Sequence, residues 1–215
     1  PVERVWIEKE DGKKRPISKP CFEDKVVQRA VVMILEAIFD PDFHAFSHGF
    51  RKGHSPHQAL DELREQCSKL HIQWIVDADV SGFFDTIDRS CLREMLKRRV
   101  NDGGILRLIG KWLNAGVLEA GEVTYPDQGT PQGGVASPLL ANVLLDEVDK
   151  ALERRGHAFA RYADDCNVYV RSQRAGERVM EALRRKYAAL KLHVNEAKSA
   201  VARPRDRKFL GFTFW

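Results

Sequence analysis

Two adjacent aspartates, Asp164 and Asp165, end the segment Tyr162-Ala163-Asp164-Asp165, which lies between two short β-prone runs, residues 158–161 and 167–170. This pattern predicts a β-hairpin with both carboxylates on its tight turn. Adjacent carboxylates repel, and each raises the pKa of the other unless a cation neutralises them. Hard carboxylate oxygens suit Mg²⁺. An isolated pair of this kind is more often a solvated turn, so the evidence for chemistry must come from the rest of the chain.

A third carboxylate, Asp79, follows the apolar run of residues 75–78, which predicts a buried strand. An unpaired carboxylate at the end of such a strand is costly. Two carboxylate-bearing strands side by side could hold two Mg²⁺ ions, an arrangement that drives in-line phosphoryl or nucleotidyl transfer. The alternative is that Asp77, Asp79, Asp85 and Asp88 are caps and turn formers. We adopt that interpretation for Asp88, as the N-cap of a helix over residues 89–100.

The elements that must position these acids follow from the spacing of apolar residues. The expected helices cover residues 24–38, 89–100, 137–154 and 174–190, with another that opens at Ser55-Pro56, and the expected strands cover residues 73–79, 158–163, 167–171, 199–203 and 208–214. From residue 73 onward the order is strand, helices, strand pair, helix, strands. This order predicts an α+β fold in which an antiparallel sheet of ferredoxin-like type is backed by helices.

The composition is that of a folded protein without a membrane span. The chain has 215 residues, 43% of them hydrophobic, which predicts one large domain or two small ones. No apolar run reaches the roughly 18 residues that a membrane span needs. The charged N-terminus is not that of a signal peptide. The four cysteines form no CxxC pair, so we expect them to be reduced and buried or half-buried, without zinc, in a cytoplasmic protein.

The basic residues are clustered although the net charge is only +4. Local patches occur at residues 13–15, 97–99, 184–186 and 203–208. Any one of them could be a solvated face. Several patches around an acidic metal centre favour a nucleic-acid channel, because basic walls bind phosphates while acids hold metal.

The motifs and their order resemble those of bacterial group II intron-type reverse transcriptases over nearly the whole chain. The blocks are Arg15-Pro16-Ile17 with residues 24–28, then residues 49–55, 79–88, 128–134 with 137–139, 161–165, 192–198 and 209–212. The resemblance implies a right-hand polymerase, with fingers mainly over residues 1–72. It implies a palm over residues 73–215 with a fingers-side insertion around 100–135. The thumb and later domains would be absent from this piece of a longer protein.

The resemblance also implies a metal centre. Asp79, Asp164 and Asp165 would be the catalytic carboxylates, with Asp79 and Asp164 bridging two Mg²⁺ ions, for which Mn²⁺ could substitute. The Val80 carbonyl would be a further ligand. Lys198 would protonate the leaving pyrophosphate, and the alternative is a surface lysine.

Four residues would contact the incoming nucleotide. Lys9 and Arg15 flank the turn 10–12 of a hairpin, from which cations could reach a triphosphate. Phe84 would lie under the sugar and exclude a 2′-hydroxyl, unless it is a core residue. Gln132 lies in a Gly-rich loop that permits close backbone approach to a ligand, or that is simply a flexible turn.

Template and primer would be bound elsewhere. Arg51 and Lys52 would contact the template, and Leu210, Gly211 and Phe212 would form the primer grip. The implied activity is RNA-directed DNA synthesis from dNTPs, on an RNA or DNA template and from a DNA or RNA primer, within an intron-encoded protein that binds intron RNA for retrohoming and splicing. Two alternatives stay open. One is a related enzyme of a retron, diversity-generating, phage-defence or CRISPR-adaptation system, and the other is an RNA-binding maturase whose main role is splicing. The sequence does not set the oligomeric state.

Overall fold

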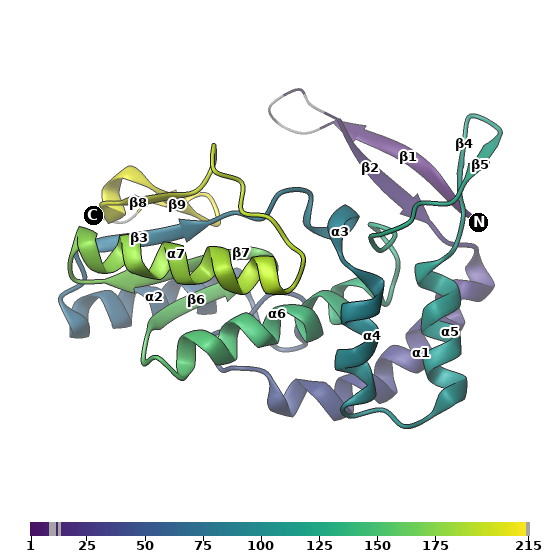
Figure 1. Ribbon diagram of the computed structural model, residues 1–215, viewed down its shortest axis with the longest axis horizontal. Helices are drawn as coiled ribbons and strands as arrows, with labels where there is room; N and C mark the ends of the chain where they lie inside the picture. The colour runs from purple at the N-terminus through teal and green to yellow at the C-terminus, as the bar shows by residue number, and fades with distance from the viewer. Residues whose placement is uncertain (9–11, 13, 214–215) are drawn as a thin grey trace. The chain divides into compact units, whose positions relative to one another are not determined.

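The computed structural model describes residues 1–8, 12 and 14–213 (Figure 1). The chain divides into two compact units, each built from two separate stretches. Unit 1 contains Pro1–Asp42 and Gly82–Val143, and unit 2 contains Phe43–Ser81 and Leu144–Trp215. The boundary expected after residue 72 falls inside unit 2, so the assignment of fingers and palm to residue ranges stays a prediction.

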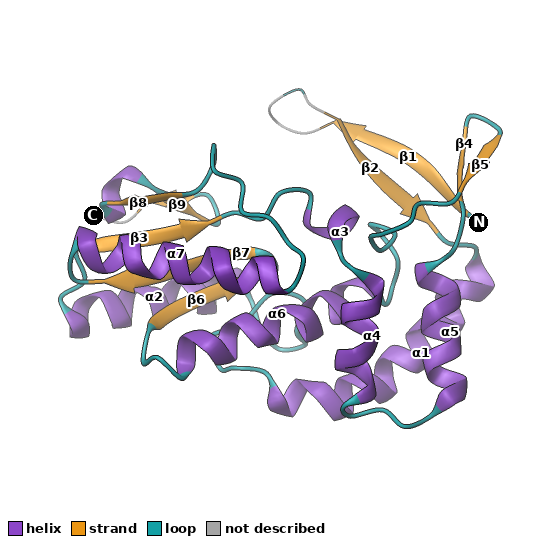
Figure 2. Ribbon diagram, viewed as in Figure 1, coloured by secondary structure: helices purple, strands orange, loops and turns teal. Residues whose placement is uncertain are grey.

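Unit 1 combines a small sheet with helices (Figure 2). Strands β1 (Val2–Glu8) and β2 (Lys14–Lys19) form the expected antiparallel hairpin, and β4 (Val117–Glu119) and β5 (Glu122–Thr124) extend the sheet in the order β2-β1-β4-β5. The helical segments are α1 (Phe22–Phe39), η1 (Asp40–Asp42), α3 (Phe83–Thr86), α4 (Arg89–Lys97), α5 (Gly103–Leu113) and the first half of α6 (Ser137–Glu153).

Local capping explains where several helices begin. The Asp88 side chain accepts a hydrogen bond from the Cys91 backbone N–H at 2.7 Å, which confirms Asp88 as the N-cap of α4. Helix α2 (Pro56–Leu70) begins with a capping box between Ser55 and Gln58. These contacts satisfy backbone donors that a helix cannot satisfy internally.

Unit 2 is built on a four-stranded antiparallel sheet. Its strands are β3 (Trp74–Ala78), β6 (Ala158–Tyr162), β7 (Asp165–Val170) and β8 (Ala200–Ala202), in the order β6-β7-β3-β8. Helix α6 precedes β6, and α7 (Gln173–Ala189) connects β7 to β8. Counted along the chain, the four strands run 4-1-3-2 across the sheet, which is the ferredoxin-like topology that the sequence predicts.

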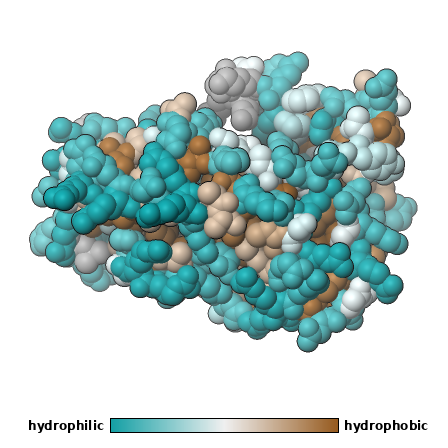
Figure 3. Space-filling model, viewed as in Figure 1, coloured by the Kyte–Doolittle hydropathy of each residue, from teal (hydrophilic) through white to brown (hydrophobic). Residues whose placement is uncertain are grey.

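Alternating side chains form the two faces of this sheet, and the two faces pack against different helices. On one face, Ile75 and Tyr169 pack with Ala59 and Leu63 of α2 in a buried cluster that includes Phe209. On the other face, α7 packs against β3, β7 and β8. The outer side of α7 is largely hydrophilic (Figure 3). The sheet is therefore held firmly enough to fix residues at its strand ends.

Two expectations are corrected. The single strand expected over residues 208–214 is a hairpin, because Leu210 and Gly211 have φ angles of 53° and 86° and separate β9 (Lys208–Phe209) from β10 (Phe212–Thr213). The cysteines are all free, but Cys21 is exposed rather than buried or half-buried. No helix in the described part of the chain is long and apolar enough to cross a membrane.

Candidate active site

The acid-bearing hairpin has the predicted form. Strands β6 and β7 pair up to Tyr162 opposite Asp165, which leaves Ala163 and Asp164 as a two-residue turn. Ala163 has a φ of 58°, in the left-handed region that such turns require. Asp164 therefore lies on the turn itself, and Asp165 is the first residue of β7.

The third acid lies on the neighbouring strand. Strand β3 pairs with β7, with Ala78 opposite Cys166, and Asp79 follows directly after β3. The Asp79 backbone is fixed on both sides, since its N–H donates to Ser199 Oγ at 3.0 Å and its carbonyl accepts from the Asn195 N–H at 2.8 Å. The structure thus brings Asp79, Asp164 and Asp165 to one end of two paired strands.

Burial and mutual repulsion raise the pKa values of these carboxyls. The pKa of Asp165 rises to about 7, first through burial and then through the charges of Asp77, Asp164 and Asp79. Burial likewise raises the pKa of Asp164, and the charge of Asp79 adds to the effect. A cluster of carboxyls held half-buried against their own repulsion is one that a bound cation would stabilise.

A fourth carboxylate, Asp77, is paired with a basic side chain. The Arg207 Nε donates to Asp77 Oδ2 at 2.9 Å, and the Arg207 Nη2 contacts the same oxygen. The pKa of Asp77 is nevertheless raised by burial, with Arg207 acting in the opposite direction. Sequence reasoning missed this pair, because Arg207 belongs to the basic run 203–208, which we interpreted as a solvated face or a phosphate-binding patch.

Lys198 lies at the edge of the acidic cluster. Its Nζ is 3.9 Å from Asp79 Oδ2, and its side chain is exposed. The structure therefore places this residue near the acids, as the resemblance implies. Its role as a proton donor stays a prediction.

The donor set suits a divalent cation that is held jointly with a ligand. Among the described residues, no group of three His, Cys, Asp or Glu side chains forms a ready metal cage. Mg²⁺ in phosphate-transfer sites is typically bound by one or two carboxylates, waters and substrate phosphates rather than by such a cage. The hard oxygens of Asp79, Asp164 and Asp165 have the chemistry for that mode of binding.

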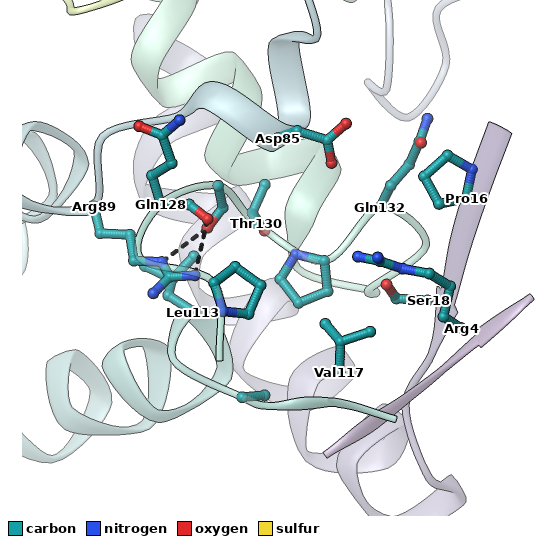
Figure 4. A pocket seen from close by; sticks show the side chains of 14 residues that line it. Arg4, Pro16, Ser18, Asp85, Arg89, Leu113, Val117, Gln128, Thr130 and Gln132 are labelled. Carbon is teal, nitrogen blue, oxygen red and sulfur yellow. Dashed lines mark hydrogen bonds between the residues drawn. The ribbon is translucent and has the colours of Figure 1, made fainter. Parts of the chain in front are cut away.

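Unit 1 contains the Gly-rich loop and a cavity beside it. Backbone hydrogen bonds tie the loop to neighbouring segments, from Thr130 N–H to the Phe84 carbonyl at 2.8 Å and from Ser18 N–H to the Gln132 carbonyl at 2.6 Å. The cavity has a volume of about 330 Å³ (Figure 4). Its lining includes Arg4, Pro16, Ser18, Asp85, Arg89, Thr130 and Gln132.

Arg89 fixes the start of this loop. Its guanidinium donates to the carbonyls of Gly129 at 2.9 Å and Gln128 at 3.0 Å, and to Asn114 Oδ1 at 3.0 Å. Figure 4 shows the two carbonyl contacts as dashed lines. Hydrogen bonds within this unit therefore hold the loop at both ends, so it is not a flexible turn.

Phe84 is half-buried, whereas its neighbour Phe83 is the core residue at 3% exposure. The two rings lie edge to face with centroids 5.2 Å apart. Arg15 lies exposed on β2 opposite Ile7, and Lys9 lies outside the described residues. The roles of these residues and of Gln132 toward a nucleotide stay predictions.

The expected template and primer residues all belong to unit 2. Arg51 donates to the carbonyls of His44 at 2.9 Å and Ser47 at 2.8 Å, so part of its guanidinium holds its own loop. Lys52 is exposed. Leu210, Gly211 and Phe212 form the turn and first position of β10 described above, and Phe212 is 53% exposed. The roles of these residues toward template and primer stay predictions.

A buried arginine beside the acids was not predicted to be important. Arg161 is fully buried at 0% exposure, as is its partner Asp149, and its Nη2 lies 2.6 Å from Asp149 Oδ2. The available signal was a charged residue inside the apolar run 158–163, opposite an aspartate on the inner face of a helix. Charged residues are rarely this deeply buried unless paired.

Comparison with known proteins agrees with this geometry. The chain matches the family model "Reverse transcriptase (RNA-dependent DNA polymerase)" over residues 7–214. The chain of apo telomerase from Candida tropicalis superimposes with a TM-score of 0.70 over 98% of this chain and 45% of its own, at 13% identity, which supports the right-hand polymerase fold. The chain therefore belongs to the reverse transcriptase family.

Two relatives match this chain over different shares of its length. Protein YkfC of Escherichia coli K12 is 32% identical over all of this chain and 65% of its own length. The group II intron-encoded protein LtrA of Lactococcus lactis subsp. cremoris is 43% identical over 70% of this chain and 25% of its own length. The chain thus spans less than two thirds of the length of these relatives, and over 70% of its own length it is similar to a group II intron-encoded protein.

Proposed function

We propose that this protein is an RNA-directed DNA polymerase that extends a primer 3′-hydroxyl with dNTPs. The observation that carries the proposal is the meeting of Asp79, Asp164 and Asp165 at the ends of β3 and β7. These three half-buried carboxylates lie close together, and burial and the charge of Asp79 raise the pKa values of Asp164 and Asp165. They suit the binding of cations that counter the negative charge of a reacting triphosphate.

Asp79, Asp164 and Asp165, with the Val80 carbonyl, would hold two Mg²⁺ ions, which Mn²⁺ could replace. When bound, these ions would polarise the primer hydroxyl and neutralise the triphosphate. The protein's own contribution is to hold the carboxylates in place and to keep Lys198 beside them as a proton donor. The pairing of Arg207 with Asp77 offsets part of the repulsion that this fourth carboxylate adds to the acidic centre.

Unit 1 would supply the contacts that select the nucleotide. Arg15 and Lys9 would bind the triphosphate, Phe84 would exclude a ribose 2′-hydroxyl, and Gln132 would present its amide from the pinned loop. In unit 2, Arg51 and Lys52 would contact the template, and residues 210–212 would contact the primer strand.

The intron context of this activity rests on the likeness to LtrA, which is named a group II intron-encoded protein. Intron RNA is accordingly the proposed partner beyond template and primer. Splicing and polymerisation are separable by mutation, because only polymerisation needs the carboxylates. A variant lacking Asp79 would then keep RNA splicing while losing DNA synthesis.

The direct test is primer extension on an RNA template by the full chain and by Asp79→Ala, with the exposed α2 residue Asp61 changed to alanine as a matched control. We expect Asp79→Ala to lower extension by orders of magnitude, while Asp61→Ala extends like the parent. Equal extension by both variants would contradict the proposal. Loss of splicing together with extension in Asp79→Ala would assign the acids to RNA binding instead.

A further inference from the structure

The guanidinium of Arg161 joins three separate segments of unit 2. Its Nε donates to Asp149 Oδ1 at 2.8 Å on α6, and its Nη2 donates to Ser47 Oγ at 2.6 Å in the segment before α2. Its Nη1 donates to the backbone carbonyl of Ala163 at 2.8 Å. Ala163 is the turn residue that directly precedes Asp164, so this buried side chain is bonded to the backbone that carries the acid.

The Nη1 hydrogen bond is made to the carbonyl of a residue whose backbone conformation is strained. Ala163 has a φ of 58°, and left-handed backbone is unfavourable for residues with a Cβ. Two-residue hairpin turns usually relieve this strain with Gly or Asn. Here the turn has alanine, and the Nη1 hydrogen bond to its carbonyl favours the same conformation from outside. Without that hydrogen bond, the turn conformation that sets the direction of the Asp164 side chain would be less stable.

The segment around Ser47 packs against the same turn. The Arg161 N–H donates to the Phe46 carbonyl and the His48 N–H donates to the Arg161 carbonyl, each at 2.9 Å. An added Cβ at Gly49 would lie 2.0 Å from the Ala163 nitrogen. Backbone thus lies directly against backbone at this point, and the segment leaves the turn no room to shift toward it.

A role confined to stability does not account for this network. Replacing a buried ion pair with apolar residues of similar volume is often neutral or stabilising, so such a pair is weak evidence for stability alone. What a guanidinium adds is a rigid fork that fixes several acceptors in one plane. In Arg161 that fork fixes Asp149 and Ser47 on one side and the turn carbonyl on the other.

We propose that Arg161 is a positioning residue for the acidic centre, which acts by holding the Ala163 carbonyl and thereby the direction of Asp164. Asp149 and Ser47 hold the guanidinium, and the Gly49 backbone closes off the turn. Arg161 itself touches no substrate. The inference rests on the proposed function, because it concerns the residues that would hold the cation.

The test compares Arg161→Lys with the parent in the full chain. Lysine keeps the charge but lacks the fork. We expect at least tenfold weaker Mn²⁺ binding by electron paramagnetic resonance and faster hydrogen exchange at the turn amides. Primer extension should need a higher Mg²⁺ concentration. Adding Ala163→Gly should restore part of the Mn²⁺ affinity, because glycine adopts a positive φ without strain.

Two controls keep the outcomes distinct. Leu183→Ala removes a buried residue of α7 and should lower the melting temperature without changing Mn²⁺ affinity at a permissive temperature. Asp164→Asn tests the proposed function by itself. If Asp164→Asn stops extension while Arg161→Lys binds Mn²⁺ like the parent, the positioning role is wrong and the proposed function stands. If Asp164→Asn extends normally, the proposed function is wrong.

A variant that keeps the buried pair covers the case in which Arg161→Lys does not fold. Ser47→Ala removes one acceptor of Nη2 and leaves Asp149 in place. It should weaken Mn²⁺ binding two- to fivefold and speed exchange at the turn, with little change in melting temperature. Unchanged Mn²⁺ affinity and exchange in Ser47→Ala would overturn the proposal.

Discussion

Replacement of glycine by alanine should have opposite effects on stability at two positions, one in the Gly-rich loop and one in helix α5. Gly133 has a φ of 107°, and a Cβ there would lie 2.7 Å from the Ser18 carbonyl oxygen. Forcing a non-glycine residue into such a conformation costs about 1–3 kcal/mol. The close approach to a backbone oxygen adds to this cost, so we expect Gly133→Ala to destabilise by about 2–3 kcal/mol. At about 2–4 °C per kcal/mol for a chain of this size, the melting temperature should fall by about 4–12 °C.

Gly110→Ala is the matched control, because Gly110 lies inside helix α5 with no atom within 4 Å of an added Cβ. Alanine there should stabilise by about 0.5–1 kcal/mol. The assay is thermal unfolding followed by circular dichroism, with the KM for dNTP measured on the same samples. Gly133→Ala should also raise this KM, because its strain falls on the hydrogen bond between Ser18 and Gln132.

Two results would refute this reasoning in different ways. Equal melting temperatures for Gly133→Ala and Gly110→Ala would mean that the loop does not pack against β2 as the structure shows. A lower melting temperature with an unchanged KM for dNTP would mean that the packing is right and that Gln132 does not contact the nucleotide.

Three further predictions concern the nucleotide and the metal. Phe84→Val should improve the kcat/KM for ribonucleotides relative to deoxynucleotides, because a smaller side chain leaves room for the 2′-hydroxyl, and an unchanged ratio would remove Phe84 from the sugar site. Arg15→Ala should raise the KM for dNTP about ten- to a hundred-fold, as expected for a charge-assisted contact of about 1.5–3 kcal/mol, and weaker template–primer binding with an unchanged KM would place Arg15 on the template track. Mg²⁺ or Mn²⁺ should support extension while Ca²⁺ binds without supporting it, which extension and binding assays on the same samples would check.

Much of unit 2 could be predicted from its sequence because the signals are local. The apolar run before Asp79 and the hairpin at Tyr162–Asp165 follow strand periodicity, and the structure confirms that they pair through β3 and β7. In unit 1, the Asp88 cap is likewise a local pattern, and it is confirmed. Such features depend on residues within a few positions of one another, so one sequence is enough to find them.

The features that were missed depend on long-range partners. Arg161 contacts Ser47 of a distant segment, and Arg207 contacts Asp77, which lies 130 residues away in the chain. No periodicity marks which basic residue will be buried and which will be solvated, so the sequence indicated no partner for either arginine. The hairpin at Leu210-Gly211 was missed for another reason, because Gly211 alone does not distinguish a bulge from a turn.

The most direct measurement is single-turnover primer extension by Asp164→Asn at saturating Mg²⁺ and dNTP. Asp206→Asn, which changes an exposed acid of the short helix η2 (Pro204–Asp206), is the control. We predict that Asp164→Asn lowers the rate by orders of magnitude with little change in melting temperature, while Asp206→Asn extends like the parent. Extension by Asp164→Asn at the parent rate would contradict the claim that these carboxylates form a polymerase centre.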